Sequence, residues 1–187
     1  MRVFGLEFGS PTGDIVARSR AAAPTYDHVG STLRDGPHAA APRSLTEAAQ
    51  VEARGQAFDD VKQALRSWQP QRAIGATAGP PAIGPDLGET VVFGFGVGPA
   101  RLLAPLRIVA VVDEPDRYGY AYGTLPGHPL RGEELFLVEQ TPDGLTVTIR
   151  VQAQPAGAMR FFAPLIHYLR RFALRRYLAA LLRAARA

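Results

Sequence analysis

Large and small side chains alternate strictly through the stretch Tyr118-Gly119-Tyr120-Ala121-Tyr122-Gly123. Successive side chains of a strand point to opposite faces, so this stretch predicts a β-strand with three tyrosines on one face. The stretch Phe93-Gly94-Phe95-Gly96-Val97-Gly98 repeats the pattern with three glycines on one face. Glycine inside a strand usually marks the close approach of another backbone or of a ligand. We therefore expect either a sheet hollowed on its glycine face to receive a helix, or a ligand-sized cavity with tyrosine hydroxyls in its wall.

The surrounding sequence continues with the period of two. Strands are predicted over residues 89–98, 106–113, 117–125, 132–140 and 144–153. The connections between them are too short for crossover helices, so neighbouring strands are expected to be antiparallel.

Two stretches, residues 55–68 and 158–185, have helical spacing instead, with apolar residues recurring every three or four positions. The second predicts a long C-terminal helix with an apolar stripe from Phe162 to Ala184 and arginines around the rest. Pro164 either kinks this helix or marks its true start. The order of elements predicts a single α+β domain.

The first part of the chain has weaker signals. Residues 1–43 contain many Gly and Pro breakers and are expected to be mostly irregular, with 26–32 as an ordered loop or short strand. Residues 1–24 are treated as a poorly defined N-terminal segment. Helix propensity favours a helix over 45–51, because alanine and glutamate are good helix formers.

Positive charge is concentrated at the C-terminal end of the chain. The net charge is +4, and eight arginines follow Asp143 without any further acid. Such a tail suits an acidic partner or an anionic membrane surface, although the simplest interpretation is a solvated helix face. Nucleic acid is not expected, because no aromatic residues are interleaved on the exposed side. The apolar stripe of the same helix is expected to pack in the core, which argues against docking of this helix on a partner or a membrane.

Several kinds of chemistry are disfavoured. The chain has no cysteine, which excludes thiolate chemistry and suits a cytoplasmic location. Its four histidines are scattered without metal-ligand spacing, so neither a metal nor a cofactor is expected. Adjacent Glu133 and Glu134 are expected to point to opposite faces of a strand and therefore not to act as a carboxylate pair. No apolar run is long enough for a transmembrane helix, and the oligomeric state is not encoded in any pattern.

A family resemblance adds to this interpretation. The stretch from Tyr118 to Pro129, followed by Gly132-Glu133-Glu134, resembles the signature of DUF1990, a family of uncharacterised bacterial and plant proteins. The resemblance covers roughly residues 25–182 and implies that the single domain occupies residues 25–187. It implies a START or Bet v 1-like helix-grip fold (the SRPBCC type), in which a curved antiparallel sheet grips a long C-terminal helix, often around an apolar cavity. In that fold residues 43–51 form a strand, against the propensity-based prediction, and we follow the resemblance there.

The leading functional hypothesis is that a small apolar molecule binds between the sheet and the C-terminal helix. Six residues are candidate ligand contacts: Tyr26, Trp68, Tyr118, Tyr120, Tyr122 and His128. One alternative is an enzyme that uses the same cavity, with Tyr120, Tyr122 or His128 as acid–base groups. Another is an interaction module that presents the arginine-rich helix face. The resemblance supplies no catalytic residues.

Overall fold

The structure is a computed structural model. It describes residues 2–3, 6–9, 13–33, 44–52, 55–79, 84–96 and 101–186. The strands are β1 (Arg2–Val3), β2 (Leu6–Phe8), β3 (Ser44–Val51), β4 (Thr77–Ala78), β5 (Thr90–Phe95), β6 (Leu102–Asp113), β7 (Arg117–Thr124), β8 (Leu130–Thr141) and β9 (Gly144–Pro155). The helices are α1 (Gly13–Arg20), α2 (Ala57–Arg66), α3 (Gln69–Ala73) and α4 (Ala163–Ala184), with 3-10 turns η1 (Ser31–Leu33) and η3 (Gly157–Phe162).

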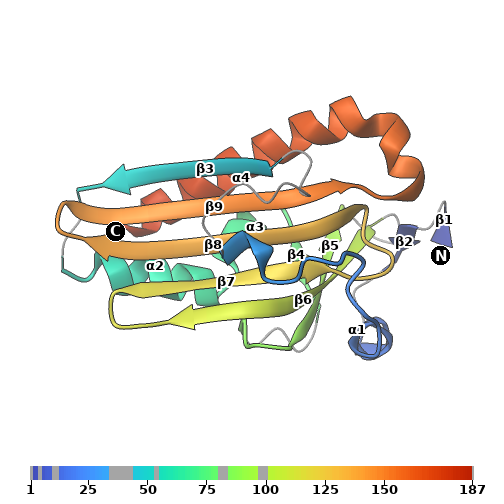
Figure 1. Ribbon diagram of the computed structural model, residues 1–187, viewed down its shortest axis with the longest axis horizontal. Coiled ribbons are helices and arrows are strands. Elements are labelled where there is room, and N and C mark those ends of the chain that lie inside the picture. Colours follow the sequence, from blue (N-terminus) through green and yellow to red (C-terminus); the bar gives the residue numbers. More distant parts are fainter. Residues whose placement is uncertain are drawn as a thin grey trace.

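The described strands form one antiparallel sheet around a meander of four long strands, β6 to β9. Short turns join these strands, as the spacing of the period-two stretches predicted. Strand β3 pairs with β9 along its whole length and closes one edge (Figure 1). The strand implied by the family resemblance over residues 43–51 is therefore confirmed for residues 44–51, and the helix favoured by propensity is wrong. Pairing with β9 outweighs the weak helix preference of alanine and glutamate there.

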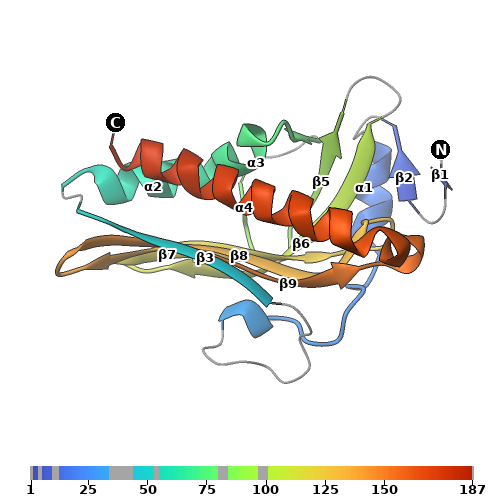
Figure 2. The same cartoon turned by 90° about the horizontal axis from the view of Figure 1, so that it is seen from above.

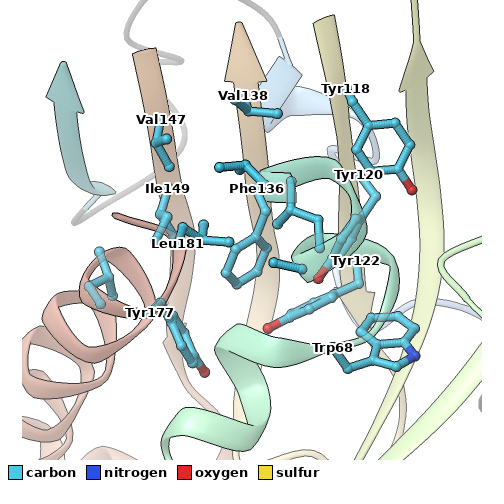
Figure 3. Packing of buried hydrophobic residues seen from close by; sticks show 14 of the residues in the cluster. Trp68, Tyr118, Tyr120, Tyr122, Phe136, Val138, Val147, Ile149, Tyr177 and Leu181 are labelled. Carbon is cyan, nitrogen blue, oxygen red and sulfur yellow. The ribbon is translucent and has the colours of Figure 1, made fainter. Parts of the chain in front are cut away.

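Helices α2, α3 and α4 lie on one face of the curved sheet, as Figure 2 shows. Between the helices and the sheet lies an aromatic cluster (Figure 3). The ring of Phe136 stacks on Tyr120 with centroids 5.4 Å apart and meets Tyr177 of α4 edge-on at 5.3 Å. Trp68, between α2 and α3, meets Tyr120 edge-on at 5.3 Å. These contacts fix the position of α4 against the centre of the sheet.

The segment containing η1 covers the opposite face of the sheet (Figure 2). A β-carbon added to Gly123 would overlap the ring of Tyr26, with Cε1 at 2.7 Å. The glycine face of β7 therefore receives this N-terminal segment. The expectation that the glycine face receives the C-terminal helix is wrong for β7, because the three tyrosines point to the helix side.

Strand β5 shows the same inversion. Phe93 belongs to the main core, whereas Val92, which alternates onto the same side as Gly94, packs on Val16 of α1. Gly96 is exposed rather than packed against α4. Val97 and Gly98 lie outside the described residues. In both strands the glycines face away from the long helix because the large rings are what fill the space beneath it.

The long helix differs from the expectation at its start. Residues 157–162 form a 3-10 turn, and α4 begins at Ala163 with Pro164 in its first turn, so the proline marks the start of the helix. The second half of α4 is buried through Leu174, Tyr177 and Leu181. In the first half, the large apolar side chains of the predicted core stripe are half-exposed. The prediction that the whole stripe lies in the core is therefore wrong for the first three turns.

The N-terminal residues are also more regular than expected. Helix α1 packs Val16 against Val92 and Leu103. The irregular structure predicted there is wrong for residues 13–20, whose single buried valine gives too weak an apolar pattern to detect. Residues 34–43, which fall within the same prediction, lie outside the described residues.

Candidate ligand cavity

A cavity of about 540 Å³ lies under the first half of α4, between that helix and the sheet. Its floor comes from β5 to β9, and its roof comes from η3 and α4, with α3 closing one side. Most of the wall is aliphatic or aromatic, for example Phe93, Leu106 and Val151 from the sheet and Ile166 from the helix. Leu165, Leu169 and Phe172 in this half of the helix are about half-exposed and line the cavity.

One carboxylate faces this apolar space. Glu134 of β8 points inward, and the hydroxyl of Tyr122 donates a hydrogen bond to its Oε2. Burial raises the pKa of Glu134 to about 7, and the hydrogen bond from Tyr122 and the charge of Arg170 oppose that rise. Near neutral pH the side chain can therefore either hold or release a proton. A carboxyl of this kind is suited to accept, donate or share a hydrogen bond with a ligand.

Arg170 of α4 lies in the same wall and is only 9% exposed. Its Nη1 donates to the backbone oxygen of Ala153 at 2.8 Å, but Nε and Nη2 have no hydrogen-bond partner among the described residues. Burial lowers the pKa of Arg170, and the charge of Glu134 opposes that change. Leaving buried donors unpaired is costly, so this edge of the guanidinium favours pairing with an acceptor.

Hydroxyl groups complete the polar part of the site. Tyr122 and Tyr177 both line the cavity, and burial raises the pKa of each well above its usual value. Tyr120 lies behind them, and the side-chain amide of Gln71 donates to its hydroxyl at 3.1 Å. Burial also raises the pKa of Tyr120. These phenols therefore remain protonated at neutral pH and act as hydrogen-bonding groups rather than as bases.

His128 also lines the cavity, at the turn between β7 and β8. Its Nδ1 accepts a hydrogen bond from the backbone N–H of Leu130 at 2.9 Å. Burial lowers the pKa of His128 to about 4. The imidazole is therefore neutral at physiological pH, and its visible role is to hold the turn.

The sequence-predicted ligand contacts fall into three groups. Tyr122 and His128 line the cavity. Trp68, Tyr118 and Tyr120 are buried in the main core and do not reach its wall.

The sixth candidate, Tyr26, lies on the other face of the sheet, where its hydroxyl donates to Glu133 at 2.8 Å. Glu133 also accepts from the backbone N–H groups of Gly30 and Thr32 and from the Thr32 hydroxyl. Its contacts are those of a structural anchor for the segment around η1, and burial and this carboxylate together raise the pKa of Tyr26. The predicted opposite orientation of Glu133 and Glu134 is confirmed.

Three important residues of the cavity were missed: Glu134 as a cavity group, Arg170 and Tyr177. Arg170 falls four residues after Ile166 and four before Leu174, so helical spacing alone places it on the inward face. That signal was overlooked because arginine was assigned to the solvent side as a class.

No group of metal-binding side chains occurs among the residues that the structure describes. Nor is any helix in the described ranges long and apolar enough to cross a membrane.

A curved antiparallel sheet that holds a long C-terminal helix over an apolar cavity defines the helix-grip class of START and Bet v 1-like proteins. Solved structures agree. A hypothetical protein from Helicobacter pylori aligns with a TM-score of 0.58 at 11% identity, over 76% of this chain and 88% of that one. Ara h 8.0201 aligns with a TM-score of 0.52 at 12% identity, over 78% of this chain and 99% of that one.

Sequence comparison identifies the family. Residues 25–180 match the family described as "Domain of unknown function (DUF1990)". A UPF0548 protein from Deinococcus radiodurans is 37% identical, with 91% of each chain covered. The chain belongs to the DUF1990 family.

Proposed function

We propose that this protein binds a small amphipathic molecule, with its apolar body in the cavity and an acidic or acceptor group at Arg170. The observation that carries this proposal is a buried arginine edge without a partner in the wall of an otherwise apolar cavity. The helix-grip neighbours are compatible with ligand binding.

The size and lining of the cavity support the apolar part of the proposal. At about 540 Å³, it falls within the range of about 300–1,000 Å³ that is usual for small-molecule sites. Its apolar wall favours hydrocarbon or aromatic groups, at about 25 cal/mol for each Å² of apolar surface removed from water.

The geometry of Arg170 supports an acidic end group. Nε and Nη2 lie on one edge of the planar guanidinium, and such an edge pairs with the two oxygens of a carboxylate or phosphate. The side chain lines the cavity but Nε and Nη2 are themselves buried, so the proposal requires the guanidinium to rotate toward the ligand. Glu134 does not oppose such a ligand when it is protonated, and it then donates a hydrogen bond of its own.

Filling the cavity tests the apolar part. Ala173 faces the cavity from α4, and Ala179, on the same helix, is outside its lining. We expect Ala173→Phe to abolish binding of a dansyl-labelled fatty carboxylate, measured by fluorescence titration, while Ala179→Phe binds it as the unsubstituted protein does. Equal binding by both variants would show that the probe sits elsewhere and would contradict the proposal.

Replacing the arginine tests the polar part. A hydrogen bond to a charged group contributes about 1.5–3 kcal/mol. We therefore expect Arg170→Met to lower the affinity for the dansyl-labelled carboxylate by about 10- to 100-fold. The methyl ester of the same probe should bind both proteins equally. A similar loss for the acid and its ester would mean that Arg170 shapes the cavity without recognising charge.

A second candidate function is proton transfer to a bound molecule, and Glu134 is the observation that favours it. A carboxyl with a pKa of about 7 in an apolar wall has the property that general acid–base catalysis needs. If the protein is an enzyme, Glu134→Gln abolishes turnover of a compound found in the cavity and retains its binding. Retained turnover in that variant would exclude Glu134 as the proton carrier.

A further inference from the structure

Helix α4 carries a second apolar stripe, distinct from the one that meets the core. Phe161, Leu165, Tyr168, Leu169 and Phe172 recur at intervals of three and four and lie on one side of the helix and its preceding turn. Phe161 is 88% exposed and Tyr168 is 67% exposed. A continuous exposed patch of large apolar residues usually marks a contact surface.

Cationic side chains flank this second stripe. Arg160, Arg171, Arg175 and Arg176 are all exposed, and the guanidinium of Arg176 lies 5.6 Å from the ring centroid of Phe172. No acidic residue follows Asp143 in the sequence. The exposed side of residues 160–176, in η3 and α4, therefore combines aromatic rings with positive charge, and no acid within this segment neutralises it.

We propose that η3 and the first half of α4 dock on an anionic lipid bilayer. An amphipathic helix with aromatic and aliphatic residues on one face and arginines beside them lies in the interfacial plane of a membrane, with its apolar face among the acyl chains. Arginine side chains there reach the phosphate groups, and each basic residue near an anionic surface adds to the attraction.

Charge favours a bilayer over a second copy of the chain as the occupant of this surface. In a symmetric dimer the same patch would meet itself, so the arginines of one copy would face those of the other. Anionic head groups supply the opposite charge around an apolar interior. The surface matches that combination.

Docking in this orientation would connect the bilayer to the cavity. Leu165, Leu169 and Phe172 belong both to the exposed stripe and to the cavity wall. An apolar ligand would then pass between the acyl chains and the cavity without crossing water. The docking itself does not depend on the proposed ligand, so it is tested without one.

The experiment is flotation of the full chain with vesicles of phosphatidylcholine alone or mixed with phosphatidylglycerol. We expect recovery with the mixed vesicles at low salt and loss of most of it at high salt, because salt screens exposed charges. The double variant Phe161→Ser with Tyr168→Ser should lose binding. Leu87→Ser, a matched change at another exposed apolar residue (69%), should retain it.

Charge reversal provides a second arm. Arg171→Glu should weaken binding to the mixed vesicles by about tenfold. Arg131→Glu is the matched control, because Arg131 pairs with Asp27 of the segment that covers the other face of the sheet. Equal recovery with neutral and anionic vesicles, or equal loss in the variant and its control, would overturn the proposal. So would a change from dimer to monomer in the Phe161 and Tyr168 variant, measured by sedimentation, because the patch would then be a self-association surface.

Discussion

Replacing Leu174, Tyr177 and Leu181 with alanine is expected to abolish cooperative folding, although the three changes affect only one helix. All three side chains are buried between α4 and the sheet. Each large-to-small change of this kind costs about 2–5 kcal/mol. Three together match the whole free energy of unfolding of a typical domain, about 5–15 kcal/mol.

The first half of the same helix, together with the preceding turn η3, provides the control. Replacing Phe161, Leu165 and Leu169 with alanine removes a comparable amount of apolar side chain from exposed or half-exposed positions. Thermal and denaturant unfolding followed by circular dichroism should give a cooperative transition near that of the unsubstituted protein. If the two triple variants lose similar stability, then α4 is packed uniformly and the division of the helix into two halves is wrong.

Opposite effects on stability are expected from the adjacent carboxylates of β8. Burial raises the pKa of Glu134 to about 7. The pKa of a glutamate in an unfolded chain is about 4.3. The folded state therefore binds this proton more tightly than the unfolded chain does. The stability that this tighter proton binding gives the folded state is fully present below pH ~4 and is lost as the pH rises to ~7. Glu134→Gln should accordingly raise the free energy of unfolding at pH 8 by about 2–3 kcal/mol and leave it unchanged at pH 4.

Glu133→Gln should instead lower the free energy of unfolding at pH 8. Glu133 accepts hydrogen bonds from two backbone N–H groups and two hydroxyls, and an amide nitrogen in place of one oxygen would oppose some of those donors. We expect a loss of about 3 kcal/mol at pH 8, since hydrogen bonds to charged groups contribute about 1.5–3 kcal/mol each. Urea unfolding of both variants at pH 4 and pH 8 measures the two effects. Destabilisation by both variants at pH 8 would contradict the assignment of Glu134 to an apolar environment.

The sheet could be predicted from sequence because its signals are local. Alternation in Tyr118–Gly123 and the short turns between strands determine the antiparallel meander without reference to distant residues. Strand β3 could not be predicted in that way, because residues 44–51 become a strand only by pairing with β9, about one hundred positions later. The family resemblance supplied that non-local information.

The candidate site was predicted only in part, for a similar reason. Alternation correctly grouped the three tyrosines but could not tell which face of the sheet the helix covers. Classifying arginine as a surface residue hid Arg170, although its helical spacing places it inward. The half-exposed apolar residues of α4 could not be separated from the buried ones by periodicity, because both sets recur with the same helical period. A cytoplasmic location and the division into a segment 1–24 and a single domain over residues 25–187 stay predictions.

Strand β8 continues from its two glutamates into the apolar run Leu135-Phe136-Leu137-Val138, which is buried on both faces of the sheet. Such a run cannot specify its own register, because a slip of one residue exchanges one apolar face for the other. The two glutamates before this run do specify the register. A slip that brings Gly132 to the place of Glu133 would leave its four donors without a carboxylate. A slip in the other direction would put Glu133 on the apolar cavity face, with every following side chain inverted. The pair therefore favours the native register of β8 over a slipped one. Loss of Glu133 removes the penalty against misaligned pairing as well as the hydrogen bonds themselves.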